Sequence, residues 1–267
     1  MDTNPNLVDL RLALDLADLA DAVTMERFRA SDLVVETKPD LTPVSEADRA
    51  VEQLLRKRIV EERPDHAVLG EEFGGDGAGA TARWIIDPID GTKNYVRGIP
   101  VYATLIALER HGFLSVGVAS APALGRRWWA ARDHGAFADG VPMRASKVAR
   151  LEDAQLGHSS VSSWRQHGLM EPFLELERRC WRGRGFGDFW THMMVAEGAV
   201  DVAAEPEVSL WDVAAVQVIV EEAGGRFTNL AGVPRPDGGS AVSTNGLLHD
   251  EVLGILTGGG QGGGRPR

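Results

Sequence analysis

The sequence predicts an α+β half followed by an α/β half. Two long helical patterns precede a run of strand patterns, which is typical of α+β folds. From residue 151 to residue 256 short apolar strands alternate with helical patterns, as in α/β folds. The composition, with 43% apolar and 25% charged side chains in 267 residues, is that of a globular chain with a sizeable core. We therefore expect two halves, residues 1–150 and 151–256.

The first half opens with two predicted helices. Residues 7–28 form the first, and the second begins after Ser45, a plausible N-cap with Asp48 in a capping-box position, and ends before Pro64. The polar segment 36–43, which contains two prolines, is a loop or an edge segment. The expected buried face of the first helix holds Leu7, Leu10, Leu14, Ala17 and Asp21. Strands are expected at 66–69, 84–86, 101–108, 114–121, 127–131 and 135–138.

The second half alternates between the two kinds of element. Its strands are expected at 155–160, 181–186, 200–204, 226–228 and 241–243. Its helices are expected at 168–179, 189–197, 212–223 and 249–256. Residues 257–267 are rich in glycine and are predicted to be a disordered tail.

Charge and composition exclude several classes of partner. The net charge of −11 and the pI of about 5.1 argue against nucleic-acid binding through a basic surface. No apolar stretch approaches the ~18 residues of a membrane span, so no membrane partner is expected. A single cysteine, Cys180, and no visible signal peptide predict a cytoplasmic protein. An acidic chain can still bind an anionic substrate where bound cations reverse the local field.

One acidic segment carries most of the predicted chemistry. Asp87 and Asp90 follow an apolar strand in Trp-Ile-Ile-Asp-Pro-Ile-Asp-Gly-Thr. Pro88 stiffens the turn, Gly91 permits close backbone approach, and Thr92 can begin a helical turn whose N–H groups face an anion. Carboxylates, carbonyls and water suit Mg²⁺ rather than Zn²⁺. The alternative is a solvated turn at a strand end.

Three further acidic positions accompany this motif. Glu71 lies in Gly-Glu-Glu after another predicted strand, although such a tripeptide is common on surfaces. Asp212 follows Trp211 just before an apolar helix, where an N-cap is the favoured explanation if the residue is taken alone. For Asp48, taken alone, a role in the capping box is the favoured explanation. Taken singly, each of these carboxylates has an ordinary structural explanation.

Together, the four motifs resemble those of the inositol monophosphatase family. They occur in family order, and the segment from Lys38 to Asp48 resembles the N-terminal signature of that family. The resemblance covers residues 7 to about 256. It implies a layered αβαβα sandwich, a homodimer, and an Mg²⁺-dependent phosphomonoesterase with a small-molecule phosphate ester as substrate.

The resemblance also implies roles for individual residues. Glu71, Asp87, Asp90, Asp212 and the backbone carbonyl of Ile89 are the expected metal ligands, for two or three Mg²⁺ ions. Asp48, Glu71 and Thr92 are the expected catalytic residues, and the Asp48–Thr92 pair would orient the attacking water. Lys38 matches a family lysine near the metal site. The expected substrate-binding residues are Asp90, Gly91, Thr92, Asp188, Glu205 and Asp212.

Asp188 and Glu205 bear on the choice of substrate. Two carboxylates around the pocket, near the aromatic residues Phe189 and Trp190, favour an amine over a neutral polyol. The Gly-Asp pair at 187–188 resembles the histidinol-phosphate phosphatase branch, which implies hydrolysis of L-histidinol phosphate in histidine biosynthesis. The alternative within the family is inositol-1-phosphate, and Asp188 could instead cap the helix that begins near Phe189. A non-catalytic, metal-stabilised binding protein is the alternative from another class.

Overall fold

The structure is a computed structural model that describes residues 4–39, 41–75 and 80–258. The predicted tail lies outside these residues from residue 259 onward. Within the described part, no helix combines the length and the apolar character that a membrane crossing would require.

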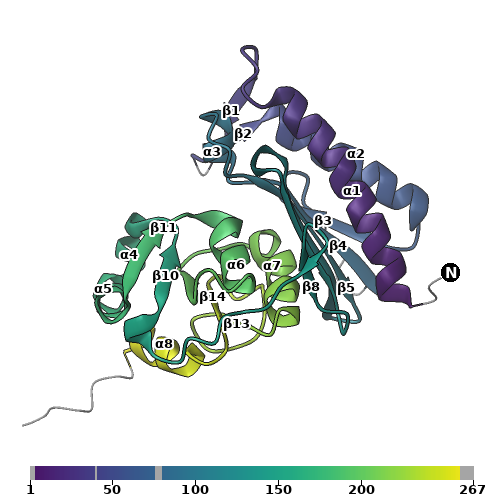
Figure 1. Cartoon of the computed structure of the whole chain (residues 1–267). Coiled ribbons are helices and arrows are strands. Elements are labelled where there is room, and N and C mark those ends of the chain that lie inside the picture. Colours follow the sequence, from purple (N-terminus) through teal and green to yellow (C-terminus); the bar gives the residue numbers. More distant parts are fainter. Residues whose placement is uncertain (1–3, 40, 76–79, 259–267) are drawn as a thin grey trace, which may run out of the picture.

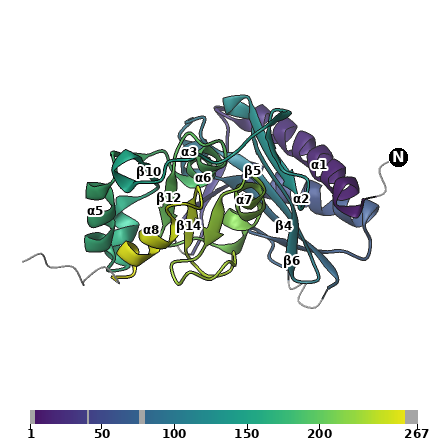
Figure 2. The same ribbon diagram turned by 60° about the horizontal axis from the view of Figure 1, so that its bottom comes forward.

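Five layers alternate between helices and sheets (Figure 1). Helices α1 (Pro5–Arg27) and α2 (Glu46–Glu62) cover one face of a seven-stranded sheet. Helices α6 (Asp188–Ala196) and α7 (Leu210–Glu222) lie between that sheet and a five-stranded sheet. Helices α5 (Met170–Arg179) and α8 (His249–Leu256), with the short α4 (Val161–Gln166), cover the far side of the smaller sheet (Figure 2). The αβαβα sandwich is confirmed.

The larger sheet is nearly all antiparallel. Its strands follow chain order from β3 to β9, and β3–β4 is the parallel pair. The strands are β3 (Ala67–Gly70), β4 (Ala82–Asp90), β5 (Ala103–Arg110), β6 (Phe113–Ala121), β7 (Arg126–Ala131), β8 (Ala136–Ala138) and β9 (Val141–Pro142). A one-turn helix, α3 (Thr92–Val96), follows β4, and a 3₁₀ turn spans Pro122–Leu124. The segment predicted as a loop or an edge is a small hairpin of β1 (Val35–Thr37) and β2 (Pro43–Ser45).

The smaller sheet has the mixed order β11–β10–β12–β14–β13. β10 is parallel to both of its neighbours, whereas β14 is antiparallel to β12 and β13. The strands are β10 (Gln155–His158), β11 (Arg182–Gly185), β12 (Val202–Glu205), β13 (Arg226–Thr228) and β14 (Ala241–Thr244). A 3₁₀ turn at Leu151–Asp153 precedes the sheet. The sequence did not predict α4, which buries Trp164 against Phe173 of α5.

The buried face of α1 differs from the predicted face. Leu12, Ala13, Leu16, Ala17 and Ala20 are buried, whereas Leu7, Leu10 and Leu14 are only partly buried. α1 contacts both α2 and the sheet, and apolar residues cover much of its circumference. The periodicity therefore predicted a helix correctly but could not select its buried side.

Candidate active site

The acidic motif lies inside the end of β4 rather than beyond it. The register between β4 and β5 shifts between Asp87 and Asp90, where Pro88 has no N–H to donate to the ladder. Asp87 is 2% exposed, and its Oδ1 accepts the Ile89 N–H at 3.0 Å. This irregularity lets two carboxylates three residues apart face the same side.

The third carboxylate of the site comes from the first turn of α7. Ser209 is the N-cap of that helix, and Asp212 is its N3 residue in a capping box, so the expected alternative of an N-cap at Asp212 is wrong. Its Oδ2 accepts the Ser209 N–H at 2.8 Å. Carboxylate oxygens of Asp87, Asp90 and Asp212 lie within 4.8 Å of one another. We call these three residues the acidic cluster.

Burial and mutual repulsion disfavour ionisation of the acidic cluster. Burial, followed by the charges of neighbouring carboxylates, raises the pKa values of Asp87 and Asp90 well above their usual range. Burial is also the main reason that the pKa of Asp212 rises to about 7. A divalent cation would relieve this repulsion, and an all-oxygen donor set suits Mg²⁺ or a similar hard ion.

Glu71 approaches the cluster but does not join it. It lines the same cavity and contributes to the raised pKa values of Asp87 and Asp212. Its Oε1 accepts a hydrogen bond from Lys38 Nζ at 2.8 Å, and Lys38 also binds Glu72 at 2.5 Å. The predicted ligand and the predicted lysine are therefore brought together as an ion pair.

Asp48 has two roles, because it belongs to the capping box of α2 and also to the predicted pair with Thr92. It is fully buried, and its Oδ2 accepts the Ser45 N–H at 2.8 Å in the capping box. Its Oδ1 accepts the Thr92 hydroxyl at 3.1 Å, and that hydroxyl also lies 3.0 Å from the Ile89 carbonyl oxygen. Burial raises the pKa of Asp48. The predicted Asp48–Thr92 pair is thus present, with Thr92 lining the cavity.

Gly91 connects the acidic cluster with the predicted substrate carboxylate. Its φ of +85° is readily adopted by glycine, and an added Cβ would lie 3.0 Å from the Val101 carbonyl oxygen and 3.3 Å from Asp188 Oδ2. Asp188 Oδ2 in turn accepts a hydrogen bond from Asn94 Nδ2 at 3.2 Å. Sequence reasoning missed Asn94, although it lies two residues beyond Thr92 in the same motif.

Asp188 does not cap α6. It is the first helical residue, after the N-cap Gly187, and its Oδ2 accepts a hydrogen bond from the Asn94 side chain of α3. Asp90 Oδ2 accepts the Phe189 N–H at 2.8 Å instead. The expected capping alternative for Asp188 is therefore wrong, and its carboxylate lines the cavity. Burial raises the pKa of Asp188, and Lys93 opposes this effect.

Glu205, at the end of β12, is the other predicted substrate carboxylate, and it also lines the cavity. It is 7% exposed, and burial raises its pKa well above the usual range. Its Oε1 lies 3.8 Å from His192 Nε2, and neither atom has a hydrogen-bond partner among the described residues. Phe186 also lines this cavity, whereas Trp190 packs edge-to-face against Phe186.

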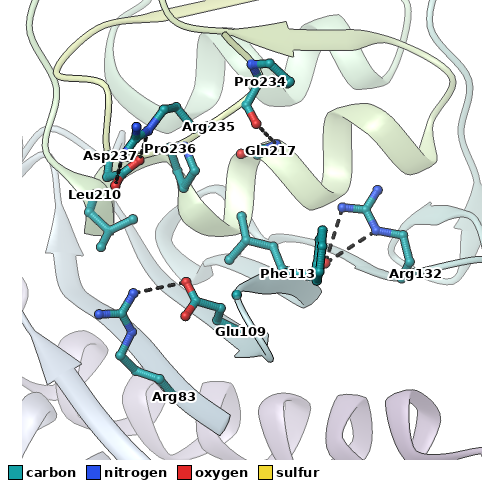
Figure 3. A pocket seen from close by; sticks show the side chains of 12 residues that line it. Arg83, Glu109, Phe113, Arg132, Leu210, Gln217, Pro234, Arg235, Pro236 and Asp237 are labelled. Carbon is teal, nitrogen blue, oxygen red and sulfur yellow. Dashed lines mark hydrogen bonds and ion pairs between the residues drawn. The ribbon is translucent and has the colours of Figure 1, made fainter. Parts of the chain in front are cut away.

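The three carboxylates of the acidic cluster line one cavity of about 1200 Å³ together with Glu71, Thr92, Asp188 and Glu205, whereas Asp48 lies buried behind Thr92. A second cavity of about 410 Å³ lies where β4 and β5 approach α7 (Figure 3). Its arginines are already paired, Arg83 with Glu109 at 3.0 Å and Arg132 with Glu221 at 2.8 Å. The larger cavity therefore holds the converging carboxylates, and we take it as the candidate active site.

Comparisons with known proteins show the family of this chain. The model of the inositol monophosphatase family matches residues 8–257. A histidinol-phosphatase of Streptomyces coelicolor is 58% identical, with 94% of this chain and 97% of the relative covered. A histidinol-phosphatase of Mycobacterium tuberculosis is 59% identical, with 94% and 98% covered. The structure of an inositol monophosphatase from Zymomonas mobilis is 28% identical, with 95% and 99% covered and a TM-score of 0.85. The chain belongs to the inositol monophosphatase family.

Proposed function

We propose that this protein is a histidinol-phosphatase, an Mg²⁺-dependent phosphoric monoester hydrolase that converts L-histidinol phosphate to L-histidinol and phosphate. The observation that carries the proposal is the meeting of Asp87, Asp90 and Asp212 beside the Asp48–Thr92 pair. The two relatives at 58% and 59% identity, both named histidinol-phosphatase, support the choice of substrate.

The acidic cluster is the proposed metal site. Asp87, Asp90 and Asp212 would hold the cations, together with the Ile89 carbonyl oxygen and Glu71, which now pairs with Lys38. Four carboxylates exceed what one Mg²⁺ ordinarily takes, so we propose two or three ions. When bound, Mg²⁺ polarises phosphoryl oxygens and lowers the pKa of water.

The chain supplies the orientation of the reactants. Thr92 donates its hydroxyl hydrogen to Asp48, which leaves the hydroxyl oxygen free to accept a hydrogen bond from the attacking water. The N–H groups of Gly91 and Thr92 face the phosphate. The water attacks phosphorus in line, and histidinol leaves as its alcohol without a phosphoenzyme.

Asp188 and Glu205 are the proposed specificity residues. Both carboxylates line the cavity that contains the acidic cluster, and Glu205 Oε1 has no hydrogen-bond partner among the described residues. An ammonium group or a protonated imidazole on a substrate in this cavity would offset the negative charge of both carboxylates and favour their ionised forms. Inositol offers hydroxyl groups but no positive charge, so this pair favours histidinol phosphate.

We further propose a cytoplasmic homodimer in which the half at 1–150 contributes most of the metal ligands and the half at 151–256 contributes the specificity residues. Only Asp212 crosses this division, because it is a metal ligand that comes from the second half. Sedimentation of the purified protein tests the dimer directly.

A phosphate-release panel tests the substrate. It compares histidinol phosphate, inositol-1-phosphate and fructose-1,6-bisphosphate, each with Mg²⁺ and with EDTA. We expect the highest kcat/KM for histidinol phosphate and no turnover in EDTA. Preference for inositol-1-phosphate would contradict the proposed substrate. Full activity in EDTA would show that the reaction does not require a metal ion.

A further inference from the structure

A buried glutamate of α2 lies beneath the turn that carries Glu71. Glu52 is completely buried, and its Oε2 accepts the Glu72 N–H at 2.7 Å while its Oε1 accepts the Phe73 N–H at 3.1 Å. Two consecutive backbone donors immediately after Glu71 therefore bind one carboxylate. Charge-assisted hydrogen bonds of this kind are stronger than those between neutral groups.

Arg56 ties the same carboxylate to both ends of the turn. Its Nε donates to Glu52 Oε1 at 2.7 Å. Its guanidinium also donates to the carbonyl oxygens of Val68, at 3.3 Å, and of Gly74. The turn is closed on itself by the Gly70 N–H, which donates to the Gly74 carbonyl oxygen at 3.0 Å.

The backbone at Gly70 is shaped around this carboxylate. A Cβ added there would lie 2.0 Å from Glu52 Oε1, so glycine is required for the close approach. Glu52 also follows Asp48 by one helical turn, which places both side chains on one face of α2. One helix face thus supports the water-orienting pair and the turn that carries Glu71.

We propose that Glu52, held by Arg56, is a positioning residue that fixes Glu71 for metal binding. It touches neither substrate nor metal, and it acts through the backbone of residues 70–74. The acidic cluster has the other three carboxylates preassembled, whereas Glu71 depends on this turn for its place. Partners behind a metal ligand commonly change metal affinity by about 10- to 100-fold when mutated. This inference rests on the proposed metal-dependent function.

The test is Glu52→Gln, which keeps the shape but replaces one acceptor oxygen with a donor. Mg²⁺ binding by isothermal titration calorimetry should weaken by about 10-fold or more, and the half-saturating Mg²⁺ concentration for phosphate release should rise in parallel. The matched control is Glu62→Gln, because Glu62 forms an ion pair of the same spacing on the same helix, with Arg58 at 2.9 Å, but at the surface. The control should leave both quantities unchanged.

The outcomes separate the inference from its premise. A purely structural Glu52 would lower the melting temperature while Mg²⁺ affinity stays at the wild-type value, and that result would overturn the proposal. Arg56→Lys provides a milder loss of the same contacts and decides the question if Glu52→Gln does not fold. A wild-type protein that neither binds Mg²⁺ nor requires it would refute the proposed function instead.

Discussion

The metal-free acidic cluster should be a source of instability, and Asp212→Asn should reveal it. Burial raises the pKa of Asp212 from 3.8 to about 7 in the folded protein. At pH 8 the folded state must therefore hold an ionised carboxylate that the unfolded state ionises more easily. A shift of about three units at about 1.4 kcal/mol per unit gives a penalty of about 4 kcal/mol.

The asparagine removes this penalty at a small cost. Its Oδ1 can still accept the Ser209 N–H that Asp212 Oδ2 now accepts at 2.8 Å. The lost charge at the N-terminus of α7 removes about 0.3–1 kcal/mol of favourable interaction with the helix dipole. A net gain of about 3 kcal/mol in the free energy of unfolding remains, which is about 6–12 °C in melting temperature for a chain of this size.

The pH dependence gives the sign of the effect. Because the folded pKa of Asp212 lies above the unfolded value, the folded state binds the proton more tightly between pH 4 and pH 7. The stabilisation that protonation provides is therefore complete below about pH 4 and is lost as the pH rises through 7. Wild-type protein in EDTA should lose stability over this interval, and Asp212→Asn should lose less.

The assay is thermal and urea unfolding in EDTA at pH 5 and pH 8. The two proteins should differ most at pH 8 and by less than half as much at pH 5, where folded Asp212 is still protonated. Mg²⁺ should stabilise the wild type more than the variant, because the variant lacks a proposed ligand. A variant that is less stable than the wild type at pH 8 in EDTA would refute the argument that repulsion and burial dominate at this site.

Three further substitutions test other parts of the structure. Asp188→Thr should lower kcat/KM for histidinol phosphate about 10-fold more than for inositol-1-phosphate, since a charged hydrogen bond is worth about 1.5–3 kcal/mol. Equal losses for both substrates in the phosphate-release assay would exclude a role of Asp188 in specificity. Thr92→Val should lower kcat by about 10²-fold, because the hydroxyl bound to Asp48 is lost. The free energy of unfolding in urea should change by only about 1 kcal/mol. Retained turnover would exclude water orientation by this pair. Trp164→Ala should cost about 3–5 kcal/mol in urea unfolding because the indole is fully buried against Phe173, and a cost below about 1 kcal/mol would contradict that packing.

The sequence could predict features that depend on local pattern. The capping box from Ser45 to Asp48 and the strands β5 and β6 follow from residues close together in the chain. Resemblance to a family supplied the rest of the candidate site, including the Asp48–Thr92 pair. The structure then showed that Asp48 serves both the cap and this pair, which a single motif cannot reveal.

Features that depend on distant neighbours could not be predicted. The buried side of α1 was misassigned because its apolar residues cover much of the helix, and only packing against α2 and the sheet selects one face. A helix cap was the alternative role for Asp188. Instead, Asp90 accepts the Phe189 N–H at the start of α6, although the two residues are 99 positions apart in the chain. Glu52 was overlooked because its backbone partners follow it by about 20 residues.

The chain by itself determined which residue types are available and the order of its elements, since periodicity, turn residues and caps act over a few positions. The fold decided which of these groups meet: Asp87 and Asp90 from β4 join Asp212 from α7, while Glu71 stays paired with Lys38. The interaction between two charges depends on their distance in space and on their burial, and not on their separation along the chain. Both the clustering and the raised pKa values therefore exist only after β4, α2 and α7 have packed together.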